Sequence, residues 1–441
     1  MPDGPTLTPQ EQVGAITASE IAAYLDSFQS DLARQAAIGR FLDAGPQATR
    51  AFWSYVEGQR GLRVGAWVFI AEPAQVEAVL QNDTEFSVCE YDRRMRATSG
   101  RFYLGMDPPE HDRDAAMGAI IPSWNQYPPT GARDTALLHR VMQVAERACR
   151  EALANAGLLA KLAQLTDEGA VCRASLPQLF GPVLDACAAE CFGIAGPSSL
   201  SLFLWAKELT WYHFRAYADD AGDRACARQA SGQYAAHVKA AIAAIAEPPE
   251  GPRKAKLEQI VAKLREHSPS ASDEDIARVL SNILTGALTA TYKAFSDAVI
   301  LYARSHRGEV PWPVSRERSL YPLYEQMVSR TLVEHRRGSL DAVYRTFIGA
   351  PRPFEGASVD LKTGDRVIVW LGGSLQREPD NLFGVGLHKC PGMDMGKAMI
   401  EGALRALARL TSARPPRLER ERDLDYLVFA EPDALIAEHQ P

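Results

Sequence analysis

The chain has 441 residues, of which 46% are hydrophobic and 23% charged, a globular composition with enough chain for a sizeable core. The formal net charge is −7 and no basic block stands out, so nucleic acid is not an expected partner. The N-terminus MPDGPTLTPQEQ is polar, and no apolar run approaches the roughly 18 residues that span a bilayer. We therefore expect a cytoplasmic protein without a membrane partner.

No linker, repeat or low-complexity tract divides the sequence. We expect a single domain over residues 1–441, with residues 1–16 as a flexible N-terminal segment. The seven cysteines are scattered and form no Cys-x-x-Cys pair, which argues against a zinc site or a disulfide framework. Cys187 and Cys191 lie about one helical turn apart, as is typical of small buried residues on a helix.

The first two thirds of the chain predict mostly helices. Apolar periodicity with few breakers indicates helix over residues 17–60. Residues 62–70 (LRVGAWVFI) are rich in β-forming residues and predict a strand. A short helix is expected near residues 75–80, and residues 134–264 are mostly helical.

The longest helical pattern runs from Ser272 to about Ser305 and opens with a capping signature, a serine followed by three acids. Residues 359–370 (VDLKTGDRVIVW) predict a β-hairpin that turns at Thr363–Gly364. A helix is expected from about Met393 to Thr411. The whole chain predicts a mainly α fold with a small β portion.

The segment from Phe383 to Gly392, FGVGLHKCPG, carries the most informative chemistry. Cys390 lies just before a helix N-terminus, where amide dipoles favour a thiolate over a thiol. Phe383 can pack beside the sulfur and exclude water. Three glycines allow a tight loop and a close approach of the backbone to a flat ligand; they are Gly384, Gly386 and Gly392.

The spacing Phe-x-x-Gly-x-His-x-Cys-x-Gly resembles the cysteine-ligand loop of the cytochrome P-450 superfamily. The resemblance implies haem b (iron protoporphyrin IX) as cofactor, Cys390 as the iron ligand and His388 near a propionate. A thiolate ligand favours O–O cleavage. The alternative is a structural cysteine in an ordinary glycine loop; a dinucleotide site is not indicated, because the glycine spacing differs. The implied fold is a single P-450 domain, with the haem between a long distal helix and the cysteine loop.

Two further segments resemble the family in the right order. Met106–His111 (MDPPEH) is similar to the motif that opens a helix at the haem edge, which implies that His111 bonds a propionate. Glu334–Arg337 (EHRR) matches the Glu-x-x-Arg pair that braces the haem loop. Arg345 then falls near the family's propionate-binding arginine, with Arg352 as the alternative, because a guanidinium suits a carboxylate.

The distal helix departs from the family, which usually carries an acid followed by an alcohol. Thr285–Thr291 (TGALTAT) aligns in two registers. In one, Thr289 takes the acid position and Ala290 the alcohol position; in the other, Leu288 replaces the acid and Thr289 keeps the alcohol. The acid is missing in both, and Thr289, Ala290 and Thr291 remain the candidate catalytic positions.

Two departures lie elsewhere. Ala115 replaces an arginine that the family places after the Asp-Pro-Pro motif, and the stretch between Trp370 and Phe383 is short. A loop over residues 90–101 falls where the family covers its substrate. One of its four arginines is a candidate for an anionic substrate, with solvated surface arginines or a propionate partner as alternatives; they are Arg93, Arg94, Arg96 and Arg101. Core packing is expected for Trp205 and for Trp211 to Phe214.

The resemblance implies a monooxygenase that acts on a small organic molecule with dioxygen, its electrons coming from an external ferredoxin and ferredoxin reductase. The incomplete acid–alcohol pair keeps a second class open: oxygenation driven by hydrogen peroxide, oxidative coupling or non-redox rearrangement. A haem-binding partner without catalysis is the third. Sequence alone does not identify the substrate.

Overall fold

The computed structural model describes residues 17–43, 46–112, 135–155, 171–198, 200–215, 220–246, 251–304, 342–371, 385–388, 390, 392–411, 417–419 and 434–438. Contacts group them into two compact units that interleave along the sequence. The smaller comprises the described parts of Met1–Glu90 and Ser329–Lys389; the larger comprises those of Tyr91–Val328, Cys390–Arg422 and Glu431–Pro441. Residues 1–16 lie outside the described part, and a single domain over 1–441 stays a prediction.

The smaller unit joins four helices to a mixed five-stranded sheet. Its helices are α1 (Ala18–Asp26), α2 (Asp31–Asp43), α3 (Pro46–Gly58) and α4 (Pro73–Gln81). The strands, in spatial order, are β1 (Leu62–Val64), β2 (Trp67–Ile70), β8 (Arg366–Trp370), β5 (Ala342–Phe347) and β3 (Phe86–Ser87). A separate pair consists of β6 (Arg352–Pro353) and β7 (Asp360–Leu361). The helices expected over 17–60 and near 75–80 are confirmed.

The single strand expected over residues 62–70 is wrong. These residues form β1 and β2, which pair antiparallel with Val64 opposite Trp67. Gly65 turns the chain with φ of +59°. A Cβ at this position would lie 3.1 Å from the Asp31 Cβ. The glycine inside the run is therefore the turn itself.

The hairpin expected over residues 359–370 is also wrong. Gly364 does turn the chain, with φ of +90°, but the two strands beside it enter different sheets. β7 pairs with β6, whereas β8 lies between β2, in parallel, and β5, antiparallel. Both edges of β8 are occupied, and alternation of side chains does not say which partner a strand takes.

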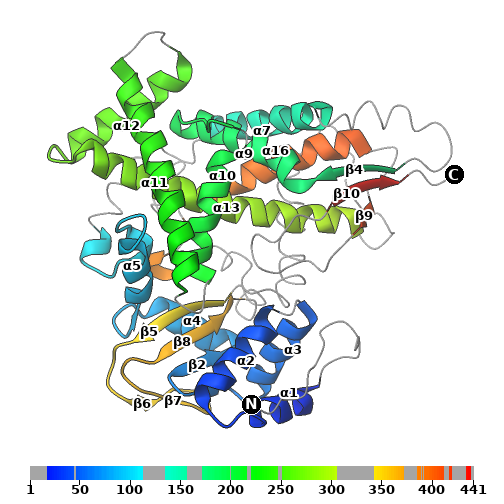
Figure 1. Cartoon of the computed structure of the whole chain (residues 1–441), viewed down its shortest axis with the longest axis vertical. Coiled ribbons are helices and arrows are strands. Elements are labelled where there is room, and N and C mark those ends of the chain that lie inside the picture. The colour runs from blue at the N-terminus through cyan, green and yellow to red at the C-terminus, as the bar shows by residue number, and fades with distance from the viewer. Residues whose placement is uncertain are drawn as a thin grey trace. The chain divides into compact units, whose positions relative to one another are not determined.

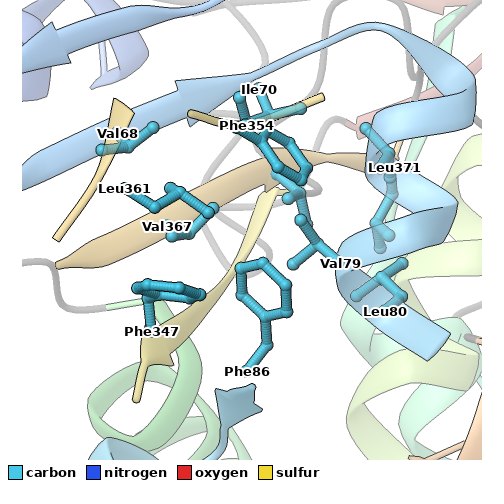
Figure 2. Close-up of a cluster of buried hydrophobic side chains, with 12 residues drawn as sticks. Val68, Ile70, Val79, Leu80, Phe86, Phe347, Phe354, Leu361, Val367 and Leu371 are labelled. Carbon is cyan, nitrogen blue, oxygen red and sulfur yellow. The ribbon is translucent and has the colours of Figure 1, made fainter. Parts of the chain in front are cut away.

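A buried apolar cluster holds α4 against this sheet (Figure 2). Val79 and Leu80 of the helix belong to the same cluster as Val367 of β8, and the rings of Phe86 and Phe347 lie with their centroids 5.3 Å apart. β8 reads buried at four consecutive positions, as expected for a central strand covered on both faces.

The larger unit is mainly helical (Figure 1). Its longer helices are α7 (Thr135–Asn155), α9 (Leu176–Phe192), α10 (Ser201–Thr210), α11 (Ala221–Ala243), α12 (Pro252–His267), α13 (Asp273–Arg304) and α16 (Met393–Thr411). Shorter helical segments are α5 (Cys89–Arg96), which begins at the boundary between the units, η1 (Tyr103–Gly105), the π-helical turn η3 (Trp211–Arg215) and η4 (Ala244–Ala246). A small sheet has the order β4 (Val171–Ser175), β10 (Ala434–Glu438) and β9 (Arg417–Glu419).

Helix α13 begins and ends as the sequence predicts. The Asp275 amide donates to Ser272 Oγ at 3.2 Å, and the Ser272 amide donates to Asp275 Oδ2 at 3.0 Å, so the predicted cap is formed. Helix α16 has the predicted bounds, and Cys187 and Cys191 are buried on α9 as expected. None of the helices in the described part of the chain is long and apolar enough to cross a membrane.

Helices α7 and α16 run side by side in the larger unit (Figure 1). Gly402 permits this approach, because a Cβ there would lie 2.2 Å from the Met142 carbonyl oxygen and 2.8 Å from the Ala145 Cβ. A side chain on Gly402 would therefore force the two helices apart.

We predict that Gly402→Ala lowers the free energy of unfolding by about 1–3 kcal/mol, the usual cost of overpacking a core. The matched control is Gly232→Ala in α11, where a Cβ meets no atom within 4 Å. That change should raise stability by about 0.5–1 kcal/mol through the unfolded chain. Urea unfolding of the two variants measures both, and equal stability of the pair would contradict the close packing at Gly402.

Candidate functional site

The predicted ligand cysteine stands at the head of α16. Cys390 precedes the helix by three residues, and the Gly392 amide hydrogen-bonds to its sulfur. Burial nevertheless raises the pKa of the Cys390 thiol above its ordinary value, and the Gly392 bond opposes this only in part. The amide donor that the sequence predicted is present, and its effect on the sulfur opposes that of desolvation.

The glycine at 386 has a local structural cause. Gly386 opens the short helix η7 (Gly386–His388) with φ of +67°. A Cβ on it would lie 3.1 Å from the Leu80 carbonyl oxygen at the end of α4. Both the dihedral and the close approach require glycine. His388 ends this helix and is partly buried, whereas Phe383 and Gly384 lie outside the described residues.

The structure separates the two arginines proposed for a propionate. Arg352 is already engaged: its Nη2 lies 2.7 Å from Glu85 Oε2, and this hydrogen bond lowers the pKa of that carboxyl. Arg345 on β5 is only 6% exposed. Its Nη1 donates to the Tyr344 carbonyl at 3.0 Å, and its Nε has no hydrogen-bond partner among the described residues. A buried guanidinium in this state suits an anionic ligand.

His111 is 5% exposed, and its ring packs edge-on against Tyr103 with the centroids 5.7 Å apart. Its Nδ1 lies 3.2 Å from Asp112 Oδ1. Ala115 and the Glu334–Arg337 pair lie outside the described residues, as does the stretch 372–384, so those expectations stay predictions.

Helix α13 presents a small-residue face in its middle. Gly286 and Ala290 are exposed and Ala287 is partly exposed, whereas the positions between them, such as Leu288 and Thr289, are buried. Gly286 and Ala290 are one turn apart and share a side of the helix. We call these three residues the α13 stripe. A Cβ built on Gly286 meets no atom of the described residues within 4 Å.

The hydroxyls of the two candidate threonines face neighbouring helices instead. Thr289 donates to the Thr285 carbonyl at 2.8 Å, and its Oγ1 lies 3.0 Å from Thr210 Oγ1 of α10. Thr291 Oγ1 lies 3.3 Å from the place where a Gly396 Cβ would be, on α16. Ala290 alone of the three belongs to the stripe. This favours the register in which alanine takes the alcohol position.

The four arginines near residue 90 are not alike. Arg94 is fully buried: its Nη1 donates to the Tyr212 carbonyl at 2.8 Å, and its guanidinium lies 5.6 Å from the Tyr212 ring centroid. A solvated surface role is therefore wrong for Arg94. Both Arg96 and Arg101 form ion pairs with Asp92. Arg93 is exposed.

Beside Arg94, the imidazole of His213 is held neutral. His213 is 1% exposed and lies in the π-helical turn η3. Burial, and then the charge of Arg94, lower its pKa to about 3. Its Nε2 lies 2.6 Å from Thr98 Oγ1. Core packing, expected for the aromatic run around it, holds for Tyr212 and His213.

Sequence reasoning missed two residues of this region: Thr210, which meets Thr289, and Asn282, which bonds Ser99. It gave His213 a packing role but not its contact with Thr98. None belongs to a motif. The available signal was spacing on α13, where Asn282, Gly286 and Ala290 recur every four residues and mark one face.

No protein-family model matches the sequence, and no curated protein matches it. Solved structures do. CalO2 is 17% identical with a TM-score of 0.63, over 88% of this chain and 95% of that one. The haem domain of CYP116B5 from Acinetobacter radioresistens is 14% identical with a TM-score of 0.62, over 89% and 95%. P450BioI, solved with an acyl carrier protein ligated to hexadec-9Z-enoic acid, is 13% identical with a TM-score of 0.63, over 89% and 99%.

These similarities establish the fold. The chain has the cytochrome P450 fold, mainly α with small sheets, as the Cys390 loop predicted. At such identities the neighbours do not transfer a substrate, an electron donor or a reaction. Those must be argued from the residues of this chain.

We predict that acid destabilises the protein through His213. The imidazole titrates near pH 6.5 when unfolded and only at about 3 when folded. Between these values the unfolded state binds more protons, so the free energy of unfolding falls as the pH drops. Between about pH 6.5 and 5, the wild type should lose roughly 1.5 kcal/mol more than His213→Gln. Urea unfolding at several pH values measures this difference, and parallel curves would refute it.

Proposed function

We propose that the chain is a haem-thiolate oxidoreductase that oxygenates a small organic molecule. The observation that carries the proposal is Cys390, placed at the head of α16 with an amide on its sulfur, in a chain with the cytochrome P450 fold. The described residues hold no group of three or more His, Cys, Asp or Glu side chains suited to a metal ion. Iron held by one thiolate and a macrocycle needs no such cluster.

The residues present fit a haem b. Cys390 would supply the iron ligand, and Arg345 would bind a propionate, since its buried Nε has no partner among the described residues. His111 and His388 are the further propionate candidates, with Arg352 less suited because Glu85 holds it. Phe383, Gly384, Gly386 and Gly392 complete the loop by resemblance. When bound, such a haem supplies oxygen activation for transfer to a substrate.

The chain's own contribution on the distal side is shape rather than acid–base chemistry. The α13 stripe consists of Gly286, Ala287 and Ala290, which admit a substrate close to the helix backbone. Neither Thr289 nor Thr291 turns its hydroxyl to the stripe. With both of these hydroxyls turned away, water, the substrate or a peroxide would be the proton sources at the stripe.

Monooxygenation with dioxygen is the leading reaction, and by resemblance its electrons would come from an external ferredoxin and ferredoxin reductase. Ala290, at the position where the P-450 family usually carries an alcohol, favours a second candidate function. This is chemistry that needs no helix alcohol: hydrogen-peroxide-driven oxygenation, oxidative coupling or rearrangement. A ligand-binding partner without turnover is the remaining outcome.

The distinguishing experiment compares the electron source. The purified protein is screened against a set of small organic compounds, once with ferredoxin, reductase and NADPH and once with hydrogen peroxide. Turnover with the reductase system alone supports monooxygenation. Turnover with peroxide alone supports the second candidate, and neither result, in a haem-loaded protein, supports a binding role.

We predict that Cys390→Ser abolishes the red-shifted carbon monoxide difference band that thiolate-ligated haem gives. The serine hydroxyl keeps the size of the side chain but lacks the soft thiolate donor. The matched control is Cys226→Ser, which changes an exposed cysteine of α11. An unchanged band in Cys390→Ser would reject Cys390 as the ligand.

We predict opposite effects of Arg345→Met on the apo and loaded protein. Removing a charge-assisted bond worth about 1.5–3 kcal/mol should weaken haem retention roughly 10- to 100-fold. The apo protein should be as stable or more stable, since the change removes a buried charge that no described carboxylate pairs with. Haem transfer to apomyoglobin and urea unfolding measure the two effects. In Arg352→Met, which breaks the Glu85 pair, haem retention should stay close to wild type.

A further inference from the structure

The five-stranded sheet of the smaller unit has two chemically different faces. Side chains alternate between the faces along each strand, and residues directly across from one another share a face. One face belongs to the apolar cluster on α4, with Val68 and Val367 among its members (Figure 2). By the register of β2, β8 and β5, the opposite face carries Trp67, Phe69, Tyr344, Arg366, Ile368 and Trp370.

Two indoles form a parallel stack on this aromatic face. Trp53 of α3 is fully buried, and Trp370 at the end of β8 is 2% exposed. Their ring planes are 5° apart, and their centroids are separated by 5.9 Å, which is an offset stack. Phe69 packs edge-on against Trp53 with the centroids 6.1 Å apart. We call Trp53 and Trp370 the indole pair.

The ring nitrogen of Trp53 lacks an acceptor. Its Nε1 is buried and has no hydrogen-bond partner among the described residues. A buried tryptophan N–H usually finds one, and a buried polar group that does not requires an explanation. Packing alone does not provide it, because an apolar side chain at this position would avoid the cost, as the apolar cluster on the other face of the sheet does.

An indole in this state suits the reversible loss of one electron. An oxidised indole is acidic and normally gives its N–H proton to an acceptor. Without an acceptor the proton stays on the ring, and a returning electron restores the original indole directly. A positive charge is costly in apolar surroundings, but the parallel neighbour lowers this cost because the two π-systems share the charge.

A fixed cation keeps the positive charge on the indole pair. The Arg366 guanidinium lies 5.7 Å from the ring centroid of Trp67 and 5.1 Å from that of Tyr344. A positive charge on either ring would be repelled by the guanidinium. Glu90 lies 3.3 Å from Arg366 and offsets part of this repulsion. Oxidation of Trp67 or Tyr344 is therefore less favourable than oxidation of the pair.

The indole pair lies on the strands that carry the propionate candidate. Arg345 of β5 is opposite Val367 of β8, and Trp370 is opposite Ala342, three residues along the same ladder. Three residues of strand span roughly 10 Å, a distance that an electron crosses by tunnelling inside a protein. Under the proposed function, the pair is thus close to the strand position that binds the cofactor.

We propose that the indole pair is an electron donor that reduces the oxidising equivalents left at the haem site when hydrogen peroxide reacts there without substrate. The source of these equivalents rests on the proposed function. The role of the pair is to protect the protein from them. A surface tryptophan would not serve as well, because water and dioxygen reach an exposed oxidised ring and destroy it.

The electrons and protons of the cycle balance with one added reductant. Reduction of hydrogen peroxide to two waters takes two electrons and two protons. The indole pair gives the first electron and keeps its N–H proton. Ascorbic acid loses two electrons and two protons: one electron completes the reduction of peroxide, and the other refills the pair. The sum is peroxide and ascorbic acid converted to two waters and dehydroascorbic acid.

The first experiment uses the haem-loaded protein without substrate. Hydrogen peroxide is added, the sample is frozen within milliseconds, and electron paramagnetic resonance with ring-deuterated tryptophan identifies indole radicals. We expect a tryptophan radical in the wild type and its loss in Trp53→Phe and in Trp370→Phe, both of which keep an aromatic ring. Bleaching of the haem by peroxide and ascorbate should be several-fold faster in both variants.

The matched control is Trp205→Phe. Trp205 of α10 belongs to the larger unit, and its Nε1 donates to Gln233 Oε1 at 2.8 Å, so it has the acceptor that Trp53 lacks. Radical yield and bleaching should stay at wild-type values in this variant. A radical and a bleaching rate that are the same in Trp53→Phe as in the wild type would overturn the proposal, provided both proteins carry equal haem.

The second experiment needs no haem. Ultraviolet laser photoionisation ejects electrons from buried and exposed indoles alike, and transient absorption separates the protonated radical cation from the neutral radical. We expect a long-lived protonated component in the wild type and in Trp205→Phe, and its loss in Trp53→Phe. A wild type that shows only the neutral radical would overturn the reversible donor. A chain that binds no haem would reject the proposed function, and this measurement would still decide whether the pair holds an oxidised state.

Discussion

Helix α13 is fixed by packing on two sides, and this constraint decides what the chain can offer to a ligand. Successive residues of a helix point about 100° apart, so Thr289, Ala290 and Thr291 must face three directions. Thr289 meets α10 and Thr291 meets α16. Turning the helix to expose either hydroxyl would break well-packed contacts on both sides. Packing against α10 and α16 therefore decides that Ala290, and neither threonine, faces the stripe.

Two buried arginines hold their charges in different ways. Arg94 lies over an aromatic ring, donates to a carbonyl and keeps the neighbouring His213 uncharged. Arg345 donates only to the backbone of its own strand, and no described carboxylate pairs with it. Burying a guanidinium costs free energy that an apolar side chain on β5 would avoid. The position is thus better explained by an anionic ligand than by the stability of the sheet.

Local signals in the sequence were sufficient for the helices and insufficient for the strands. The ends of α13 and α16 were predicted because a serine cap and apolar periodicity act within a few residues. The pairing of β8 with β2 was not, because it joins residues about 300 positions apart and depends on the whole sheet. The Cys390 loop could be found from its spacing alone. The contact of His213 with Thr98 spans 115 positions without a motif, and only the folded chain brings the two together.

The α13 stripe raises the question of where a proton for the proposed oxygen chemistry would come from. Under the proposed function, a stripe without a hydroxyl of its own would leave the substrate, water or the oxidant as the proton source. Water that entered freely would also quench reactive intermediates of such a reaction. A stripe without a proton donor of its own would therefore gain most if the access of water were limited. The stripe begins at Gly286, one helical turn after the buried Asn282, and ends at Ala290. An apolar stripe favours chemistry in which the substrate itself brings the polar group that this face of the helix does not provide.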